Sequence, residues 1–434
     1  MRITSVKLRE IGLLLAFKAL LEAVYVLFVN PVYAYSGFAL KPNGIKFLES
    51  YLFLIFLYFF LPHGEQKISA VGTKLLFILM VVPTLSLYAL KGESRTFLYL
   101  FVAGFWLTLL TIQILPRIRI RRPVGLTSTL LLGIGMLSIG VYVILVKTNG
   151  LPTLKALNLW KVYEIRSVVT WGPPLMGYLV VWQASVINPF LLSIAWYKRR
   201  YVALLGIIGL QVFLYLITAH KGFLFAPVLA GFVIYAVHKR NLLRLSLWGL
   251  IGVVSTSFAA YALAWSTMPG SLFIRRVLFV PAHISFCYYD FFSKHQLMYL
   301  AESHLNPFLS NPYSMPTVHL IGKIYFNSPA MAANTGYLGN AYMNFGALGV
   351  FLFSLIIGVI FLFLDSIASR RNTIVAMAAM IIPVESLVNG ALSVVLGTHG
   401  LLLGMLIVWL YSQRANRSVT LTARSDLFPL HRKA

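Results

Sequence analysis

The chain has 434 residues, of which 59% are apolar and only 11% are charged, and its formal net charge is +25. Soluble domains are about 45–50% apolar and about 25% charged, because a surface in water needs charged side chains. The composition, with a mean hydropathy of +0.83, therefore excludes a soluble protein. In a membrane protein, excess Lys and Arg usually lie in cytoplasmic loops, so we expect no nucleic-acid partner. The one cysteine, Cys287, cannot form an intramolecular disulfide.

Long apolar runs are the main structural signal along the chain. A bilayer core of about 30 Å requires roughly 20 apolar residues per helix, and by this measure the sequence predicts about twelve membrane spans. In chain order they are 11–30, 45–62, 73–90, 96–116, 124–146, 174–196, 201–219, 222–237, 242–266, 342–364, 373–390 and 391–412. The first run is too long for a signal peptide, which favours a spanning helix. We therefore expect a single integral membrane domain over residues 1–434.

The distribution of Lys and Arg predicts the orientation, because basic residues near helix ends resist translocation. With the N-terminus inside, about 22 basic residues fall on the cytoplasmic side and about 13 on the other. Both termini of this multi-pass protein are then cytoplasmic. Two long segments are external: 147–173, an interfacial segment, and 267–341, a large loop. Long ordered loops usually carry function, so we expect function on the external face.

Cations outnumber carboxylates on that predicted external face. The basic set near the membrane surface is Arg95, Arg166, Lys221, Arg275 and Arg276. Arginine donates bidentate hydrogen bonds to phosphate and keeps its charge when partly buried, so the set favours a site for a lipid diphosphate. The alternative is nonspecific contact with phospholipid head groups. The candidate acids are Glu93, Glu164, Asp290 and Glu302 in loops and Glu385 in the outer part of a helix.

Two of these cations lie in distinctive local sequences. Lys221 lies in ITAHKGFLFAPVL, where almost no loop separates two apolar helices, so it must lie at the membrane edge. Arg166 lies in LWKVYEIRSVV, where Trp160, Tyr163 and Arg166 recur at intervals of three. This spacing predicts an interfacial helix, although a simple snorkelling lysine and an amphipathic anchor would show the same patterns.

The large loop contains SLFIRRVLFVPAHISFCYYDFF, in which Arg275 and Arg276 precede His283, Tyr289 and Asp290. Its aromatic side chains suit the apolar faces of sugars as well as a membrane interface. The four histidines of the loop form no i,i+4 pair and no HExxH pattern, so we expect no metal.

Other polar residues are informative by their position. The first external loop, NPVYAYSGFALKPNG, contains neither Asp nor Glu, which disfavours carboxylate-centred chemistry there and favours stabilisation of a leaving group by cations. Within the first span, Lys18 and Glu22 have the i,i+4 spacing of a mutually neutralising pair. His399 falls in the last predicted span.

The segment NTGYLGNAYMNFGALGVFLFSLIIGVIFLFLD, residues 334–365, resembles the end of the long external loop in Wzy-type O-antigen polymerases. VYEIRSVV, INPFLL, AHKGFLFAPVL and RRVLFVPAHISFCYYDFF also resemble blocks of oligosaccharide repeat-unit polymerases, in the same order. The resemblance covers roughly residues 160–365. It implies an all-α polytopic membrane protein of about twelve transmembrane helices with a long periplasmic loop, an architecture similar to C-type glycosyltransferases.

The resemblance implies an enzyme of the bacterial inner membrane, acting in O-antigen or a related polysaccharide pathway. It would transfer a growing glycan from undecaprenyl diphosphate to a lipid-linked repeat unit on the periplasmic face, without metal, nucleotide sugar or other cofactor. Its partners would be the lipid-linked oligosaccharide, membrane lipid and a separate chain-length regulator. Arg166, Lys221, Arg275 and Arg276 would stabilise the leaving diphosphate.

The base and the sugar contacts are less sharply defined. Asp290 is the candidate catalytic carboxylate, and Glu164, Glu302 and His283 stay open beside it as the general base. The substrate-binding candidates are Arg95, Tyr163, His283, Tyr289, Asn334, Tyr337, Asn340, Tyr342 and Asn344. Close helix packing at the neighbouring glycines would explain part of this pattern equally well.

Three other functions fit the sequence less well. An O-antigen ligase would use the same donor and an essential loop histidine. A transporter or flippase for a lipid-linked oligosaccharide would need cations reachable from both sides of the membrane, whereas the cations here gather at one face. A purely structural membrane protein would leave Lys221 without a reason.

Overall fold

The structure is a computed structural model that describes residues 5–116, 118, 120–121, 123, 125–152, 154–157, 162–303, 308–368 and 372–411. Within these residues the regular elements are all helices. Eleven helical segments are long and apolar enough to cross a membrane, judged by length and composition. The prediction of an all-α, multi-pass membrane protein is therefore confirmed at this level.

The first half of the chain contains α1 (Ser5–Val24), the π-helix η1 (Tyr25–Val29), α2 (Asn30–Tyr33), α3 (Gly44–Phe60), α4 (Ile68–Leu76), η3 (Phe77–Val81), α5 (Val82–Lys91), α6 (Arg95–Ile114), α7 (Thr127–Asn149), α8 (Val162–Val168), α9 (Met176–Trp182), η5 (Gln183–Ile187), α10 (Asn188–Tyr197) and α11 (Tyr201–Thr218). The second half contains α12 (Lys221–His238), α13 (Leu242–Ala264), η6 (Gly270–Phe279), α14 (Val280–Phe292), α15 (Thr317–Phe326), α16 (Tyr337–Ile367), α17 (Thr373–Glu385), η8 (Ser386–Val388), α18 (Leu392–Leu396) and α19 (Leu401–Leu410).

Every predicted apolar run is helical over most of its length, but the number of long spans differs. The run 45–62 forms α3, whose 17 residues are fewer than the usual span. The run 373–390 forms the shorter apolar segment Thr373–Val388. The last run is interrupted by a turn, so His399 lies between α18 and α19 and not in a helix as predicted.

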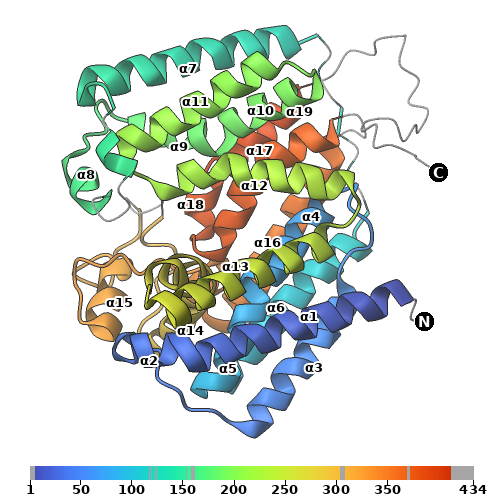
Figure 1. Ribbon diagram of the computed structural model, residues 1–434, viewed down its shortest axis with the longest axis vertical. Coiled ribbons are helices and arrows are strands. Elements are labelled where there is room, and N and C mark those ends of the chain that lie inside the picture. Colours follow the sequence, from blue (N-terminus) through green and yellow to red (C-terminus); the bar gives the residue numbers. More distant parts are fainter. Residues whose placement is uncertain are drawn as a thin grey trace.

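The long helices run roughly side by side, and their connections gather at two ends (Figure 1). One end carries α2, α8 and α15; we call it the α15 end. The start of α1 lies at the opposite end. In this view α7 and α11 form one flank and α1 and α3 the other, while α16 and α17 lie between them. This arrangement leaves α12 and α13 as the facing edges of the two flanks.

The segment Gly270–Phe292 was predicted as part of a loop but is helical and passes the length and composition test for a span. From start to end it contacts residues near the α15 ends of other helices: Gly270 with Phe28, Arg275 with Tyr33, His283 with Lys91, and Tyr289 with Phe97. Because a crossing helix would meet both ends of its neighbours, these contacts place η6 and α14 at the α15 end. The π-helix η6 also reaches the middle of the Ile68–Lys91 segment, where it contacts η3. Most of the predicted loop 267–341 is thus folded helix beside the α15 end.

The helix α16 begins at this end and then packs against α6. Backbone angles at Phe345 and Gly346 depart from helix, with φ +61° at Gly346, so the first turns of α16 are bent away from the rest. Beyond the bend, Thr108 donates a hydrogen bond to the Ser354 carbonyl over 3.1 Å. Gly104 allows α6 and α16 to approach closely. This contact fixes the position of α16 relative to α6, and with it the position of the segment at the α15 end from which α16 begins.

Candidate cation site at the α15 end

The turn between α11 and α12 brings two of the predicted cations to one corner. Only Ala219 and His220 separate the helices, and Ala219 has a φ of +53°, which allows the reversal. Arg166, on α8, donates from Nε to the Ala219 carbonyl over 3.1 Å. Burial, and then the nearby Arg166 guanidinium, lower the pKa of His220. Arg166 and Lys221 therefore flank one tight turn. The sequence predicts the short connection at Lys221, but it does not predict that Arg166 lies beside it.

The other two predicted cations lie on the π-helix η6, which meets this corner through aromatic side chains. The rings of Phe225, in the first turns of α12, and Phe273, on η6, are 6.0 Å apart. Two and three residues further on, η6 carries Arg275, which is partly buried, and Arg276, which is exposed. The elements bearing the four predicted catalytic cations are thus direct neighbours, although they come from widely separated parts of the sequence.

Arg275 is held by aromatic and polar groups from the start of the chain. Its guanidinium carbon lies 4.5 Å from the centre of the Tyr33 ring and 5.7 Å from that of Phe38. One of its nitrogens also donates to Ser36 Oγ over 3.4 Å. Cation–π contacts of this kind hold a guanidinium without neutralising its charge, so Arg275 stays a cation in this position.

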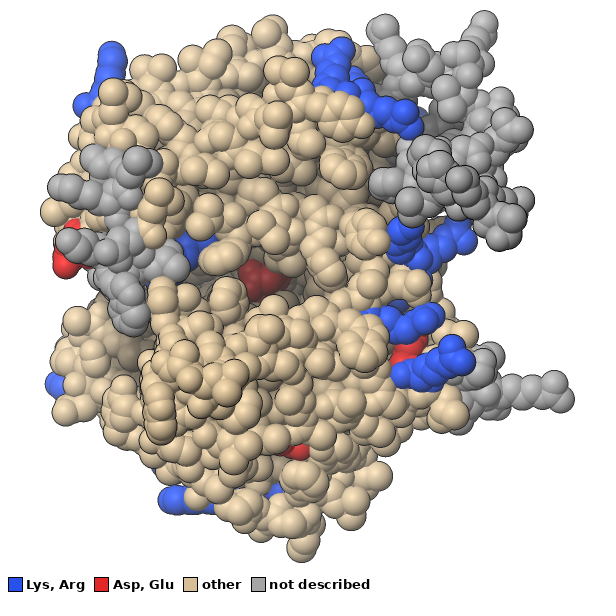
Figure 2. Space-filling model, viewed as in Figure 1, with Lys and Arg blue, Asp and Glu red and all other residues tan. Residues whose placement is uncertain are grey.

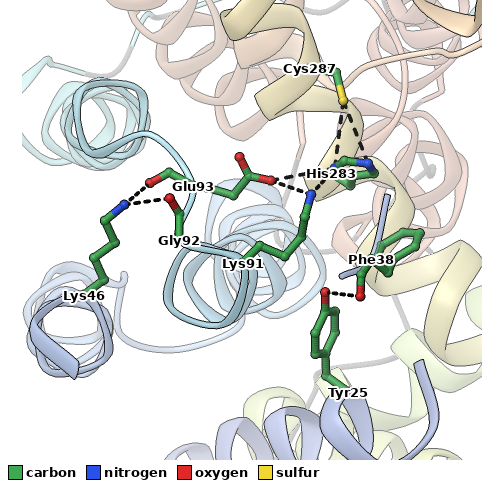
Figure 3. Close-up of polar contacts among 8 residues, drawn as sticks. All are labelled: Tyr25, Phe38, Lys46, Lys91, Gly92, Glu93, His283 and Cys287. Carbon is green, nitrogen blue, oxygen red and sulfur yellow. Dashed lines mark hydrogen bonds and ion pairs between the residues drawn. The ribbon is translucent and has the colours of Figure 1, made fainter. Parts of the chain in front are cut away.

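A partly buried polar cluster fixes η6 and α14 to the rest of this end (Figure 3). It consists of Lys46, Lys91, Glu93 and His283, and we call it the His283 cluster. Lys91 Nζ donates to Glu93 Oε1 over 2.6 Å and lies 2.9 Å from His283 Nδ1. Because an ammonium group can only donate, Nδ1 accepts and the imidazole carries its proton on Nε2. Lys46 donates to the carbonyls of Gly92 and Glu93 over 2.7 and 2.6 Å, which holds the α5–α6 connection in place.

The first loop closes over His283. A Cβ on Gly37, which has a φ of +90°, would lie 2.4 Å from His283 Nε2, so this position needs glycine. Phe38 packs beside the imidazole with ring centres 5.0 Å apart, and its carbonyl accepts a hydrogen bond of 2.9 Å from Tyr25 (Figure 3). The first loop itself has no acid, as the sequence shows. The fold nevertheless places Glu93, in the α5–α6 connection, close to this loop. A carboxylate is therefore present beside the first loop although none lies within it.

The surface between the two flanks is hollowed. Figure 2 shows a depression between the part of the molecule that holds α12 and the part that holds α13, with acidic atoms at its floor and basic atoms nearer the α8 side. Elsewhere on this face, basic atoms gather mainly at the opposite end of the bundle. In this view the hollow therefore brings acidic and basic atoms close together between the two flanks.

Two of the predicted acids at this end, Asp290 and Glu302, have structural partners. Asp290, on α14, accepts hydrogen bonds of 2.6 Å each from Lys294 and Tyr325. Burial and the hydrogen bond to Asp290 raise the pKa of Tyr325. Glu302 accepts from the Thr317 backbone nitrogen and hydroxyl over 2.5 and 2.8 Å, so it caps the start of α15. Glu302 and Tyr313 also border an open depression of about 390 Å³.

Several of the predicted sugar contacts are buried among other side chains, in keeping with the packing alternative. Tyr337 is fully buried, and Asn344 is 2% exposed and accepts a hydrogen bond from the Leu300 nitrogen. Asn340 is 7% exposed, and its carbonyl accepts from the Asn344 side chain. Asn344 links the bent start of α16 to the segment after α14, whereas Tyr337 packs in the main core. These side chains therefore have almost no surface for a substrate. Asn334 precedes α16 and is exposed.

The remaining predicted contacts are dispersed. Tyr289 packs against Phe97 and Tyr342, with ring centres 5.1 and 4.8 Å away. Arg95, at the start of α6, pairs with Glu49 over 3.1 Å and lies away from the four-cation corner in sequence and in its contacts. Tyr163 lies on α8, but its side chain is outside the described residues, as is Trp160. The Lys18–Glu22 pair forms as predicted, with further hydrogen bonds to Ser50 and Tyr51.

Among the described residues, no group of three His, Cys, Asp or Glu side chains is arranged to hold a metal ion. Comparison of the chain with protein-family models, with characterised proteins and with solved structures gives no match. We therefore infer the function from the geometry of the site.

Proposed function

We propose that the protein is a glycosyltransferase that polymerises a surface polysaccharide in the bacterial inner membrane, with the α15 end facing the periplasm. Its donor would be a glycan on undecaprenyl diphosphate, and its acceptor another lipid-linked repeat unit. The observation that carries this proposal is the meeting of α8, α12 and η6, which bear Arg166, Lys221, Arg275 and Arg276. The large periplasmic loop and the C-type glycosyltransferase-like architecture belong to the same proposal.

The cations suit the leaving group of such a reaction. Breaking the bond between the anomeric carbon and the diphosphate leaves negative charge on the phosphate oxygens. Hydrogen-bond donors that are already in place stabilise the transition state, in which this charge develops, more strongly than they stabilise the bound substrate. This difference lowers the barrier. Lys221 is the first residue of the apolar helix α12. The polyprenyl chain can therefore stay in lipid while its diphosphate reaches Lys221. In this account the His283 cluster is a support that orients η6 and its two arginines.

Substitution of single cations tests the proposal. We expect Lys221→Ala and Arg276→Ala each to lower the rate of polymer formation by roughly 100-fold or more, the range seen when one transition-state donor is removed. Lys198→Ala, an exposed lysine at the opposite end of the bundle, is the matched control and should be neutral. The rate is measured with purified protein and a lipid-linked repeat unit. Full activity in both site variants at normal protein abundance would contradict the proposal.

A further inference from the structure

One carboxylate at the α15 end, that of Glu385, is partly buried and yet has no side-chain partner among the described residues. Glu385 is the last residue of α17, and it has no hydrogen bond or ion pair with the residues that the structure describes. Most other described carboxylates bind a cation, a hydroxyl or a helix N-terminus: Glu10, Glu22, Glu49, Glu65, Glu93, Asp290, Glu302 and Asp365. Glu164 also lacks such a partner, but it is exposed on the short helix α8.

Glu385 is accessible although its helix is central. The residues from Val375 to Ile381 are buried, whereas Ile382 and Glu385, three residues apart and hence on one face of α17, are partly exposed. A carboxylate without a partner is costly in an apolar helix and marks a functional position by default. This cost is tolerated most readily where the carboxylate reaches water or a polar ligand.

The position of Glu385 relative to the cation site follows from helix directions. The helix α17 packs against α12. α12 begins at the α15 end with Lys221, and α17 ends there, because the carbonyl of Val388 lies against Gly336 at the start of α16. The two helices are therefore antiparallel, and Lys221 and Glu385 mark their ends on the same side. Acidic and basic atoms lie in the same hollow beside α12 (Figure 2).

We propose that Glu385 is the general base of the transfer reaction, an inference that rests on the proposed function. The hydroxyl oxygen of the acceptor sugar forms the new bond to the anomeric carbon of the donor. The bond from that carbon to the diphosphate breaks, and its electron pair leaves with the diphosphate beside the cations. The hydroxyl proton passes to a carboxylate oxygen of Glu385 and then to water. Asp290 and Glu302, which the sequence left open for this role, are already hydrogen bonded.

Several other ionisable groups lie on the elements packed against α17, and a pH profile must take them into account. α12 carries Lys221, Tyr235 and His238, α4 carries Lys74, and α10 ends at Tyr197. The turn before α19 carries His399. None of these groups forms an ion pair with Glu385 among the described residues. The acid limb of the rate should therefore follow the carboxylate itself.

The experiment compares wild-type protein with Glu385→Gln, Glu385→Asp and Glu10→Gln. The last makes the same chemical change at the opposite end of the bundle, where Glu10 accepts from Tyr58. General base catalysis contributes about 100-fold to 10,000-fold, so we expect kcat of E385Q to fall by about 100-fold or more while KM for the lipid donor is unchanged. We expect E385D to retain a carboxylate-dependent acid limb at a shifted pH, and E10Q to be normal.

The outcomes separate the two proposals. If wild-type protein makes no polymer, the proposed function fails before Glu385 is considered. If wild-type protein is active and E385Q polymerises at the same rate, the assignment of the base is wrong. If E385Q fails to accumulate, E385D provides the test. An acid limb of its pH–rate profile that is unchanged from wild type overturns the inference. A shifted acid limb at unchanged KM supports it.

Discussion

At the scale of single residues, the side chains that surround the candidate site are positioned by backbone features. Gly37 is the sharpest example, because its left-handed backbone lets the first loop lie against His283. The His283 cluster has no direct role in the proposed transfer step. It determines where η6, and therefore Arg275 and Arg276, lie.

Gly37→Ala tests this packing. We expect it to destabilise the protein by about 1–3 kcal/mol, since it adds both backbone strain and a collision with His283. Gly64→Ala is the matched control, because Gly64 has a φ of +80° but nothing within 4 Å of the added Cβ. Thermal unfolding in detergent measures both. Equal losses for the two variants would show that the contact with His283 adds nothing to backbone strain.

The corner at Ala219 can be tested by titration. The pKa of His220 is lowered by burial and by Arg166. Arg166→Gln removes a positive charge, so the neutral imidazole is favoured less and the pKa should rise. Nuclear magnetic resonance of protein labelled at histidine measures the shift. His63, whose pKa is lowered by burial and by Lys7, should not move, and an unchanged His220 would contradict the placement of Arg166.

At the scale of elements, close contact between α6 and α16 sets the frame of the α15 end. A Cβ on Gly104 would lie 2.8 Å from Val350 Cγ1 and 2.9 Å from Ser354 Oγ. Overpacking usually costs about 1–3 kcal/mol, so we expect Gly104→Ala to lower thermal stability by that amount. Gly133→Ala on α7, with nothing within 4 Å, should be neutral. A stable G104A variant would argue that the two helices are not so close.

The length and apolar character of the runs were sufficient to predict most of these helices, because lipid requires long stretches with internal hydrogen bonds. Local sequence could not predict the π-helix η5. There Gln211, Asn188 and Gln183 join through hydrogen bonds, and Gln211 also donates to the Ala184 carbonyl. That arrangement depends on helices distant in sequence. Polar side chains inside the bundle therefore carry tertiary information that a hydropathy pattern does not contain.

The candidate site was predictable only in part, for the same reason. The short turn at Lys221 is visible in the sequence, and so is the pair Arg275–Arg276. The contact of Lys91 with His283 joins residues 192 positions apart, and the accessibility of Glu385 depends on how α17 packs. Tyr337 and Asn344 offer hydrogen-bonding groups for sugar hydroxyls in the sequence, but only the fold shows that both side chains are buried.

At the scale of the whole molecule, the position of η6 and α14 determines the topology. If they lie across the α15 end, the exposed residue Ser314 is on the same side of the membrane as the exposed residue Leu151, and Arg240 is on the other. Single cysteines at these positions, in a Cys287→Ala background, can be labelled with an impermeant maleimide in sealed vesicles. We expect Ser314→Cys to be labelled from the same side as Leu151→Cys. Labelling from the side of Arg240→Cys would mean that α14 crosses the membrane.

The most direct test of the proposed function is to incubate purified protein with an undecaprenyl-diphosphate-linked repeat unit alone, with a chelator and without any nucleotide sugar, and to separate the products by size. We expect a ladder of longer lipid-linked glycans that disappears in Lys221→Ala. Absence of the ladder, together with movement of the intact repeat unit across liposomes containing the protein, would contradict the polymerase assignment and indicate a transporter.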